Sequence, residues 1–292
     1  MFPTIPGLHH ITSIASGARE NDAFYTTTLG LRRVKKTVNF DAPDVYHLYF
    51  GDKAGAPGTI WTSFPFPNAR RGTAGTGTTV RTAFAVPQGS LDYWEAALGG
   101  RRDTTFGAEQ LVFEGPDGEG LALVAEAEAD GSEIQSLHSV TLSLRDGGPE
   151  AEILSLMGFE EVMEEGRERL FSAPGDAHGK SVILATRPDE PAAKEGAGSV
   201  HHVAFRVADE PAQLRAREAL EEAGIAVTEV RDRQYFRSIY FRTPGGVLFE
   251  IATDGPGFDA DEPAETMGTA LKLPGQHEHL RARLEEELVP LD

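Results

Sequence analysis

The fold of this chain is decided by a short stretch in its last third, Val200-His201-His202-Val203-Ala204-Phe205. Its β-branched and alternating side chains are typical of a β-strand. Three more runs of this kind occur along the chain: Leu8-His9-His10-Ile11-Thr12, Val80-Arg81-Thr82-Ala83-Phe84 and Leu137-His138-Ser139-Val140-Thr141. Four similar openings indicate an internal repeat, and we number the repeated units modules one to four.

Each module continues in the same way after its opening strand. A helical segment ends at a glycine, which tolerates the left-handed conformation found at helix ends: Gly30, Gly99, Gly158 and Gly224. Three strand-like runs follow, so each module is predicted to be βαβββ. Because one helix leaves a sheet face uncovered, such modules must pair. The sequence therefore predicts an α+β fold in which four βαβββ modules form two paired-sheet barrels.

The repeat also suggests a division of the chain. We expect an N-terminal domain over 1–128 with modules one and two, and a C-terminal domain over 129–255 with modules three and four. Residues 256–292 begin as a loop rich in Gly, Pro and Asp. Leu280, Leu284 and Leu288 then follow at helical spacing and predict an amphipathic helix that packs on the body.

The composition narrows the function. The 292 residues include 46 Asp and Glu against 27 Lys and Arg, a formal net charge of −19, and no Cys. The acidic balance argues against nucleic acid and anionic membranes, which bind clustered basic residues. The lack of Cys excludes disulfides, thiolate metal sites and cysteine nucleophiles. Without a signal-like N-terminus or a long apolar run, we expect a cytoplasmic protein that acts on small molecules.

A comparison of the four modules isolates one metal site. The second residue of the opening pair is His10 in module one and His202 in module four, but Arg81 and Ser139 in modules two and three. The closing strand carries an acid, Glu250, in module four alone. Two imidazoles and a carboxylate suit Fe, Mn or Zn better than Ca or Mg and leave positions open for substrate and O₂. We therefore predict His10, His202 and Glu250 as metal ligands.

The same residues have a plainer interpretation, because a buried His is more often a hydrogen-bonded core residue. Glu250, however, lies in the apolar run Val247-Leu248-Phe249-Glu250-Ile251-Ala252, where an unpaired charge would be costly to bury. Thr12 shares a strand face with His10. His9 and His201 point to the opposite face of an ideal strand, so they are better placed to support the site from behind the ligands.

Other candidates have weaker claims when they are taken alone. Arg233 and Tyr240 lie upstream of Glu250 and are, without further information, a surface charge and a packing aromatic residue. His47, His138 and His178 have weaker claims: His138 occupies the first position of the opening pair in module three, but that module has Ser139 at the second.

Motifs over nearly the whole chain carry a family resemblance. In order they are Leu8–Thr12, Phe24–Leu31, Lys35–Asp41, Tyr46–Asp52, Gly198–Phe205 and Asp232–Asp254. Together they resemble the hydroquinone-type ring-cleaving dioxygenases of the vicinal oxygen chelate superfamily, which also includes glyoxalases, bleomycin resistance proteins and extradiol dioxygenases.

The resemblance implies that His10, His202 and Glu250 hold Fe(II), with Mn(II) as an alternative. Five more residues match positions that contact substrate or support the ligands in the family: His9, Thr12, His201, Arg233 and Tyr240. The implied reaction is the opening of a para-hydroquinone ring by O₂ in the degradation of aromatic compounds. The implied partners are a small aromatic substrate and O₂. Whether the chain forms a homo-oligomer is left open.

Two other functions compete with this one. A glyoxalase-type metal-dependent lyase or isomerase typically uses a carboxylate from each paired module, and the lack of an acid near Thr62 argues against it. A metal-free small-molecule binding module would not need two His and a Glu that converge.

Overall fold

The computed structural model describes residues 2–175 and 177–291, and modules one and two follow one another at the start of the chain. Module one consists of β1 (Leu8–Ala15), α1 (Ala18–Ala23), the short π-helix η1 (Phe24–Thr28), β2 (Arg32–Asn39), β3 (Ala42–Gly51) and β4 (Ile60–Pro65). Module two consists of β5 (Thr78–Pro87), α2 (Leu91–Leu98), β6 (Arg101–Thr105), β7 (Ala108–Glu114) and β8 (Gly120–Ala127).

Modules three and four repeat the same order. Module three consists of β9 (Ser136–Leu144), α3 (Gly148–Leu156), β10 (Glu160–Glu165), β11 (Glu168–Ser172) and β12 (Ser181–Thr186). Module four consists of β13 (Val200–Val207), α4 (Glu210–Glu222), β14 (Arg231–Asp232), β15 (Phe236–Arg242) and β16 (Leu248–Pro256). The four predicted glycines after the helical segments all adopt positive φ, for example 87° at Gly158 and 81° at Gly224.

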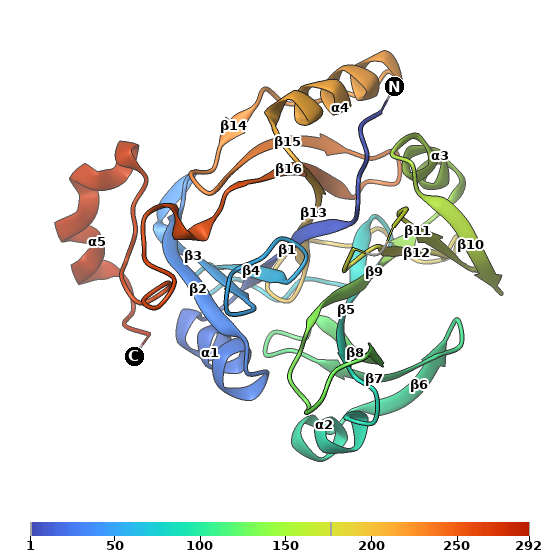
Figure 1. The fold of residues 1–292 in the computed structure, drawn as a ribbon, viewed down its shortest axis with the longest axis horizontal. Helices are drawn as coiled ribbons and strands as arrows, with labels where there is room; N and C mark the ends of the chain where they lie inside the picture. The colour runs from blue at the N-terminus through green and yellow to red at the C-terminus, as the bar shows by residue number, and fades with distance from the viewer. Residues whose placement is uncertain (1, 176, 292) are drawn as a thin grey trace.

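The modules pair into two eight-stranded sheets. One sheet has the order β14-β15-β16-β13-β1-β4-β3-β2 and joins module four to module one; the other has the order β10-β11-β12-β9-β5-β8-β7-β6 and joins module three to module two. Figure 1 shows the two sheets curling side by side, with the helices around the outside. The predicted α+β fold of four βαβββ modules is confirmed. Each sheet takes one module from each half of the chain, and the division at 128 and 255 stays a prediction.

Strand β1 of the first sheet is buried on both of its faces. Ile11 of β1 belongs to the main hydrophobic core, whereas His10 and Thr12, on the other face of the strand, are 1% and 0% exposed. A polar concave face that is closed to water can hold reactive groups in a fixed arrangement, and the candidate site lies there.

The C-terminal segment covers this first sheet. It contains η2 (Phe258–Ala260), η3 (Gly275–Leu280) and α5 (Arg281–Glu287), and Leu284 is fully buried in the main core. Figure 1 shows α5 beside β2 and β3. None of the helices within residues 2–175 and 177–291 combines the length and the apolar character needed to cross a membrane.

Candidate metal centre

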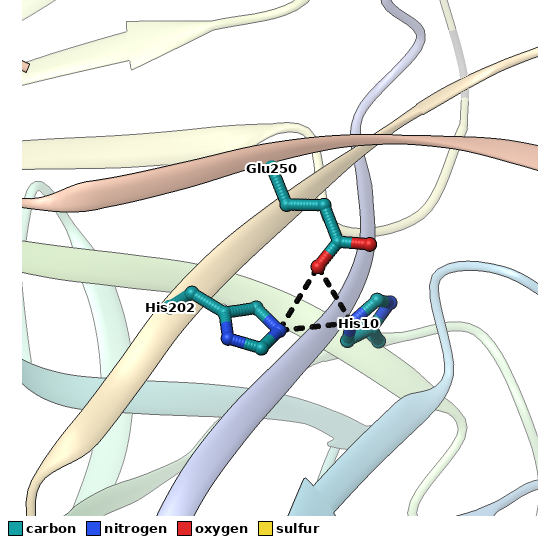
Figure 2. A group of neighbouring side chains, drawn as sticks. All are labelled: His10, His202 and Glu250. Atoms are coloured by element: carbon teal, nitrogen blue, oxygen red, sulfur yellow. Dashed lines mark hydrogen bonds and ion pairs between the residues drawn. The ribbon is translucent and has the colours of Figure 1, made fainter. Parts of the chain in front are cut away.

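Three neighbouring strands of the first sheet bring the predicted ligands together. His10 comes from β1, His202 from β13 and Glu250 from β16, and Figure 2 shows their side chains pointing toward one another. The Oε2 atom of Glu250 lies 2.9 Å from His202 Nε2 and 3.4 Å from His10 Nε2. The two Nε2 atoms are 3.3 Å apart. One donor atom from each residue therefore converges on one small volume.

The charge state of this cluster fits a divalent cation. Burial lowers the pKa of His202 to about 4, so its imidazole is neutral at pH 7. Burial raises the pKa of Glu250, but the imidazoles of His10 and His202 outweigh this effect and hold it well below its usual range. Glu250 Oε2 is buried beside the imidazole nitrogens of His202 and His10. A neutral imidazole beside an ionised, buried carboxylate is the state that metal binding requires.

A β-bulge places each neighbouring histidine beside a ligand. In the antiparallel pairing of β1 with β13, Leu8 lies opposite Phe205 and His10 opposite Ala204, so His9 is an extra residue. On the other strand His201 is extra in the same way, because Thr12 lies opposite His202 and Ser13 opposite Val200. A bulge changes the direction in which a side chain points. The alternation of an ideal strand therefore does not fully predict where the side chains of His9 and His201 lie.

Each candidate ligand has a second polar contact. Nδ1 of His9 lies 2.9 Å from Nδ1 of His10, and Nδ1 of His201 lies 2.7 Å from Nδ1 of His202. The hydroxyl of Ser238 donates to Glu250 Oε1. Contacts of this kind fix the orientation of a ligand and leave its other donor atom free for a metal. Sequence reasoning missed Ser238, although its period-2 relation to Tyr240 on β15 puts both residues on one strand face.

A cavity of about 200 Å³ lies against these ligands. Its wall consists mainly of rings: His10, Phe40, His47, Tyr49, Phe64, Phe66, His201, His202, Phe236 and Tyr240. Asn39, Asp41 and Arg233 complete the lining. The structure thus places His201, Arg233 and Tyr240 at the cavity, whereas His9 and Thr12 do not line it.

Arg233 and Tyr240 act as a unit at the cavity. Arg233 Nε donates to the Tyr240 hydroxyl at 3.1 Å, and the guanidinium lies 5.4 Å from the centre of the Tyr240 ring. Arg233 Nη2 also lies 3.4 Å from Asp41, a largely exposed carboxylate. Burial raises the pKa of Tyr240, so its hydroxyl keeps its proton. The site therefore offers one permanent positive charge and one protonated phenol beside the ligands.

His47, a weaker candidate from the sequence, lies at the cavity. It lines the cavity from β3 and is 9% exposed, and its two ring nitrogens contact Tyr49 and Thr62. The signal available in the sequence was its alternation with Tyr49 on a strand, which puts both residues on the same face.

A second cavity is larger, at about 820 Å³, and lies where the segments 71–80 and 192–202 meet. It touches His201 and His202 but none of the other predicted site residues. Its lining carries as many acidic as basic side chains: Asp117, Glu119, Asp146 and Glu195 against Arg71, Arg145, Lys194 and Arg242. The smaller cavity, which contacts two of the three candidate ligands, is therefore the better substrate site.

Sequence comparison finds known proteins that match nearly the whole chain. Residues 7–251 match the family model of the Glyoxalase/Bleomycin resistance protein/Dioxygenase superfamily. The chain is 40% identical over 303 residues to MhqO of Bacillus subtilis (strain 168), named as a candidate ring-cleaving dioxygenase, with 98% of this chain and 96% of that protein covered. It is 34% identical to a chlorohydroquinone/hydroquinone 1,2-dioxygenase of Sphingobium indicum, with 96% and 95% covered.

Solved structures show the same architecture. The crystal structure of a candidate dioxygenase from Bacillus subtilis superposes with a TM-score of 0.95 at 39% identity and covers 99% of this chain and 98% of that one. Glyoxalase I from Zea mays superposes with a TM-score of 0.65 at 13% identity, covers 85% and 92%, and shares the fold alone.

Proposed function

Because the chain belongs to the Glyoxalase/Bleomycin resistance protein/Dioxygenase superfamily, we propose that it is an Fe(II)-dependent ring-cleaving dioxygenase that opens hydroquinone-type rings with O₂. The observation that carries the proposal is the convergence of His10, His202 and Glu250 at a small cavity lined by rings. Relatives that cover nearly the whole chain carry ring-cleaving dioxygenase names, which supports the reaction class.

The donor set supports the choice of metal. Two imidazoles and one carboxylate are typical of non-haem Fe(II) oxygenases, because three protein ligands leave coordination positions free. Bound there, Fe(II) would supply the one-electron chemistry that O₂ needs to react with an aromatic ring. The protein supplies the remaining requirements, which are an oriented ring, charged and protonated groups near its oxygens, and little water.

The cavity supports a substrate with one ring. An apolar cavity of ~150 Å³ accommodates benzene, and the present cavity of about 200 Å³ leaves room for hydroxyl or small ring substituents. Phe40, Phe64 and Phe236 offer edges and faces against which a flat ring can pack. Two fused rings would exceed this space, so we propose monocyclic hydroquinones.

Arg233, Tyr240 and His201 have proposed roles at the substrate. The guanidinium of Arg233 lowers the energy of negative charge that develops on substrate oxygens. Arg233 also holds the oxygen of Tyr240 through Nε, so the Tyr240 hydroxyl can donate its proton into the cavity. His201 lines the cavity with a ring whose Nδ1 is engaged by His202, which leaves Nε2 to hydrogen-bond the substrate.

The competing functions make different demands on the site. A proton-transferring lyase or isomerase needs a strong base beside its substrate, typically a second carboxylate. At the position opposite Thr12 on β4 the chain has Thr62, whose hydroxyl donates to Thr12. A metal-free binding module would take up no metal at all.

Oxygen uptake decides among these functions. With protein loaded anaerobically with Fe(II), we expect one O₂ consumed per hydroquinone ring opened, both atoms of ¹⁸O₂ initially incorporated, and loss of activity when the iron is oxidised to Fe(III). An oxygen electrode and mass spectrometry of the product measure this. Isomerisation of a thiol adduct of an α-ketoaldehyde without O₂ uptake, with Zn(II) or Ni(II) bound, would contradict the dioxygenase proposal.

Two substitutions test the proposed roles of Arg233 and Tyr240 at the substrate. Arg233→Ala and Tyr240→Phe should each lower kcat/KM by about 10²-fold, the usual cost of removing a donor to developing charge. Iron content should stay at the wild-type level, because neither side chain is one of the three candidate ligands. Arg237→Ala is the matched control, since Arg237 lies on the same hairpin but pairs with Asp232 and Glu210 away from the cavity. Wild-type kinetics in both variants would return Arg233 and Tyr240 to packing roles.

A further inference from the structure

A pair of opposite charges joins modules one and four at the wall of the smaller cavity. Asp41 lies in the turn between β2 and β3, and Arg233 follows β14. Nη1 and Nη2 of Arg233 lie 3.5 and 3.4 Å from the same oxygen, Oδ2 of Asp41. The side chain of Arg233 is 20% exposed and that of Asp41 is 67% exposed. Both residues line the cavity, so the pair extends from the cavity wall to the solvent.

The turn that carries Asp41 has a fixed position. The side-chain oxygen of Asn39 accepts a hydrogen bond from the backbone N–H of Asp41 at 2.9 Å. Nε2 of His277, in η3 of the C-terminal segment, lies 2.9 Å from the carbonyl oxygen of Phe40. The ring centre of Phe40 lies 5.9 Å from the guanidinium carbon of Arg233. The carboxylate of Asp41 is therefore held beside the cavity, although it is largely exposed.

This pair dominates the charge at the cavity wall. Among the lining residues that fall within 2–175 and 177–291, Asp41 is the one with a carboxylate and Arg233 the one with a guanidinium. Most of the other lining side chains are rings. A bound substrate therefore meets one negative and one positive side chain, which already face each other.

The guanidinium of Arg233 has little capacity left for a second carboxylate. Its two terminal nitrogens, which pair with a carboxylate in the usual two-pronged geometry, face Asp41. Its Nε donates to the hydroxyl of Tyr240. A carboxylate on a substrate ring would have to compete with Asp41 for the guanidinium, and it would be repelled by the charge of Asp41. An uncharged ring substituent meets neither obstacle.

We propose that Asp41 is a specificity-determining residue that favours hydroquinones with uncharged ring substituents over those that carry a carboxylate. The inference rests on the proposed function and narrows its substrate class. Asp41 acts on the substrate through its own charge and through its pairing with Arg233. Two like charges a few ångströms apart at a solvated protein surface change an affinity by about tenfold.

Two substrates that differ in charge but hardly in size test the proposal. They are 2,5-dihydroxybenzamide, which is neutral, and 2,5-dihydroxybenzoate, which is an anion at pH 7. Asp41→Asn should shift the ratio of their kcat/KM values toward the benzoate by about tenfold. Any contact of the ring carboxylate with the metal contributes equally in both proteins, so the change in the ratio reports on Asp41. Asn suits a turn as well as Asp does, so the hairpin should persist.

Two further variants separate the charge of Asp41 from its place in the fold. Asp41→Glu keeps the negative charge and should keep the wild-type preference for the amide. Asp44→Asn is the matched control, because Asp44 is an exposed aspartate on the same hairpin that does not line the cavity. It should leave the ratio unchanged. Added salt should weaken the preference of the wild type, because it screens exposed charges.

A binding measurement without turnover separates specificity from the reaction. NMR titration of metal-free protein should show that the wild type prefers benzamide to benzoate and that Asp41→Asn shifts this preference toward benzoate by about tenfold. An unchanged ratio in Asp41→Asn, the same shift in Asp44→Asn, or the same shift in Asp41→Glu would each overturn the role of Asp41. Absence of O₂ uptake by the wild type would instead overturn the proposed function, and the titration would still decide the role of Asp41.

Discussion

Glu250→Gln is expected to abolish tight metal binding and, with it, all oxygen uptake. The substitution keeps the size of the side chain but removes the one negative charge that His10 and His202 share. Wild-type protein reconstituted anaerobically with Fe(II) or Mn(II) should retain about one ion per chain after desalting, whereas Glu250→Gln, His10→Ala and His202→Ala should retain almost none. Metal analysis of the desalted protein measures this directly.

Thermal unfolding gives an independent view of the same variant. Metal that binds the folded state alone raises Tm, so added Mn(II) should stabilise the wild type and leave Glu250→Gln unaffected. Without metal, Glu250→Gln should be no more stable than the wild type, because the imidazoles that hold the pKa of Glu250 below its usual range stabilise its ionised form in the folded protein.

Glu150→Gln is the matched control for the metal-binding test. Glu150 is fully buried outside the site, accepts hydrogen bonds from Thr243 and Gly245, and has a pKa raised by burial. It should bind metal as the wild type does. Stoichiometric binding that survives His10→Ala would show that modules one and four do not form the site together.

Lys35→Met is expected to produce the largest loss of stability, about 3–5 kcal/mol in the free energy of unfolding, as when one partner of a buried ion pair is removed. Lys35 on β2 is fully buried, and its Nζ lies 2.6 Å from Asp261 and 2.7 Å from Glu262. Methionine fills most of the space but leaves the nearly buried Glu262 without its cation. Urea unfolding at pH 7 measures the loss.

A second substitution separates charge from packing at Lys35. Lys35→Met/Glu262→Gln should recover part of the lost stability, because it removes the uncompensated carboxylate. If the double variant is no more stable than Lys35→Met, the loss is one of packing and not of charge. Lys53→Met is the matched control, since Lys53 is an exposed lysine in the loop after β3.

The same ion cluster ties the C-terminal segment to the candidate site. Asp261 and Glu262 follow Phe258, whose ring centre lies 5.0 Å from that of Tyr49 and 6.4 Å from that of Phe236. Phe236 in turn packs at 5.1 Å from His10. A loosened segment should therefore also reduce activity, because the aromatic wall behind His10 loses its support.

Local features of the sequence determined the repeat and the candidate ligands. Strand alternation and helix-ending glycines depend on residues close in the chain, so they predict βαβββ modules without knowledge of their packing. The ligand set followed from residue types, because only modules one and four have His at the second position and only module four has an acid in its closing strand. A functional site leaves such a signal when its residues break the apolar pattern of a strand.

Tertiary structure alone decided how the site is built around those ligands. His10 and His202 are 192 positions apart, and the pairing of β1 with β13 that joins them depends on sheet formation across the whole chain. The bulges at His9 and His201 arise from a register that no single strand specifies. The contacts of Ser238 with Glu250, of His47 with Thr62, and of Phe258 with Phe236 each join separate strands or segments. Residues far apart in sequence meet only when the fold closes, so these partners could not be assigned from local patterns.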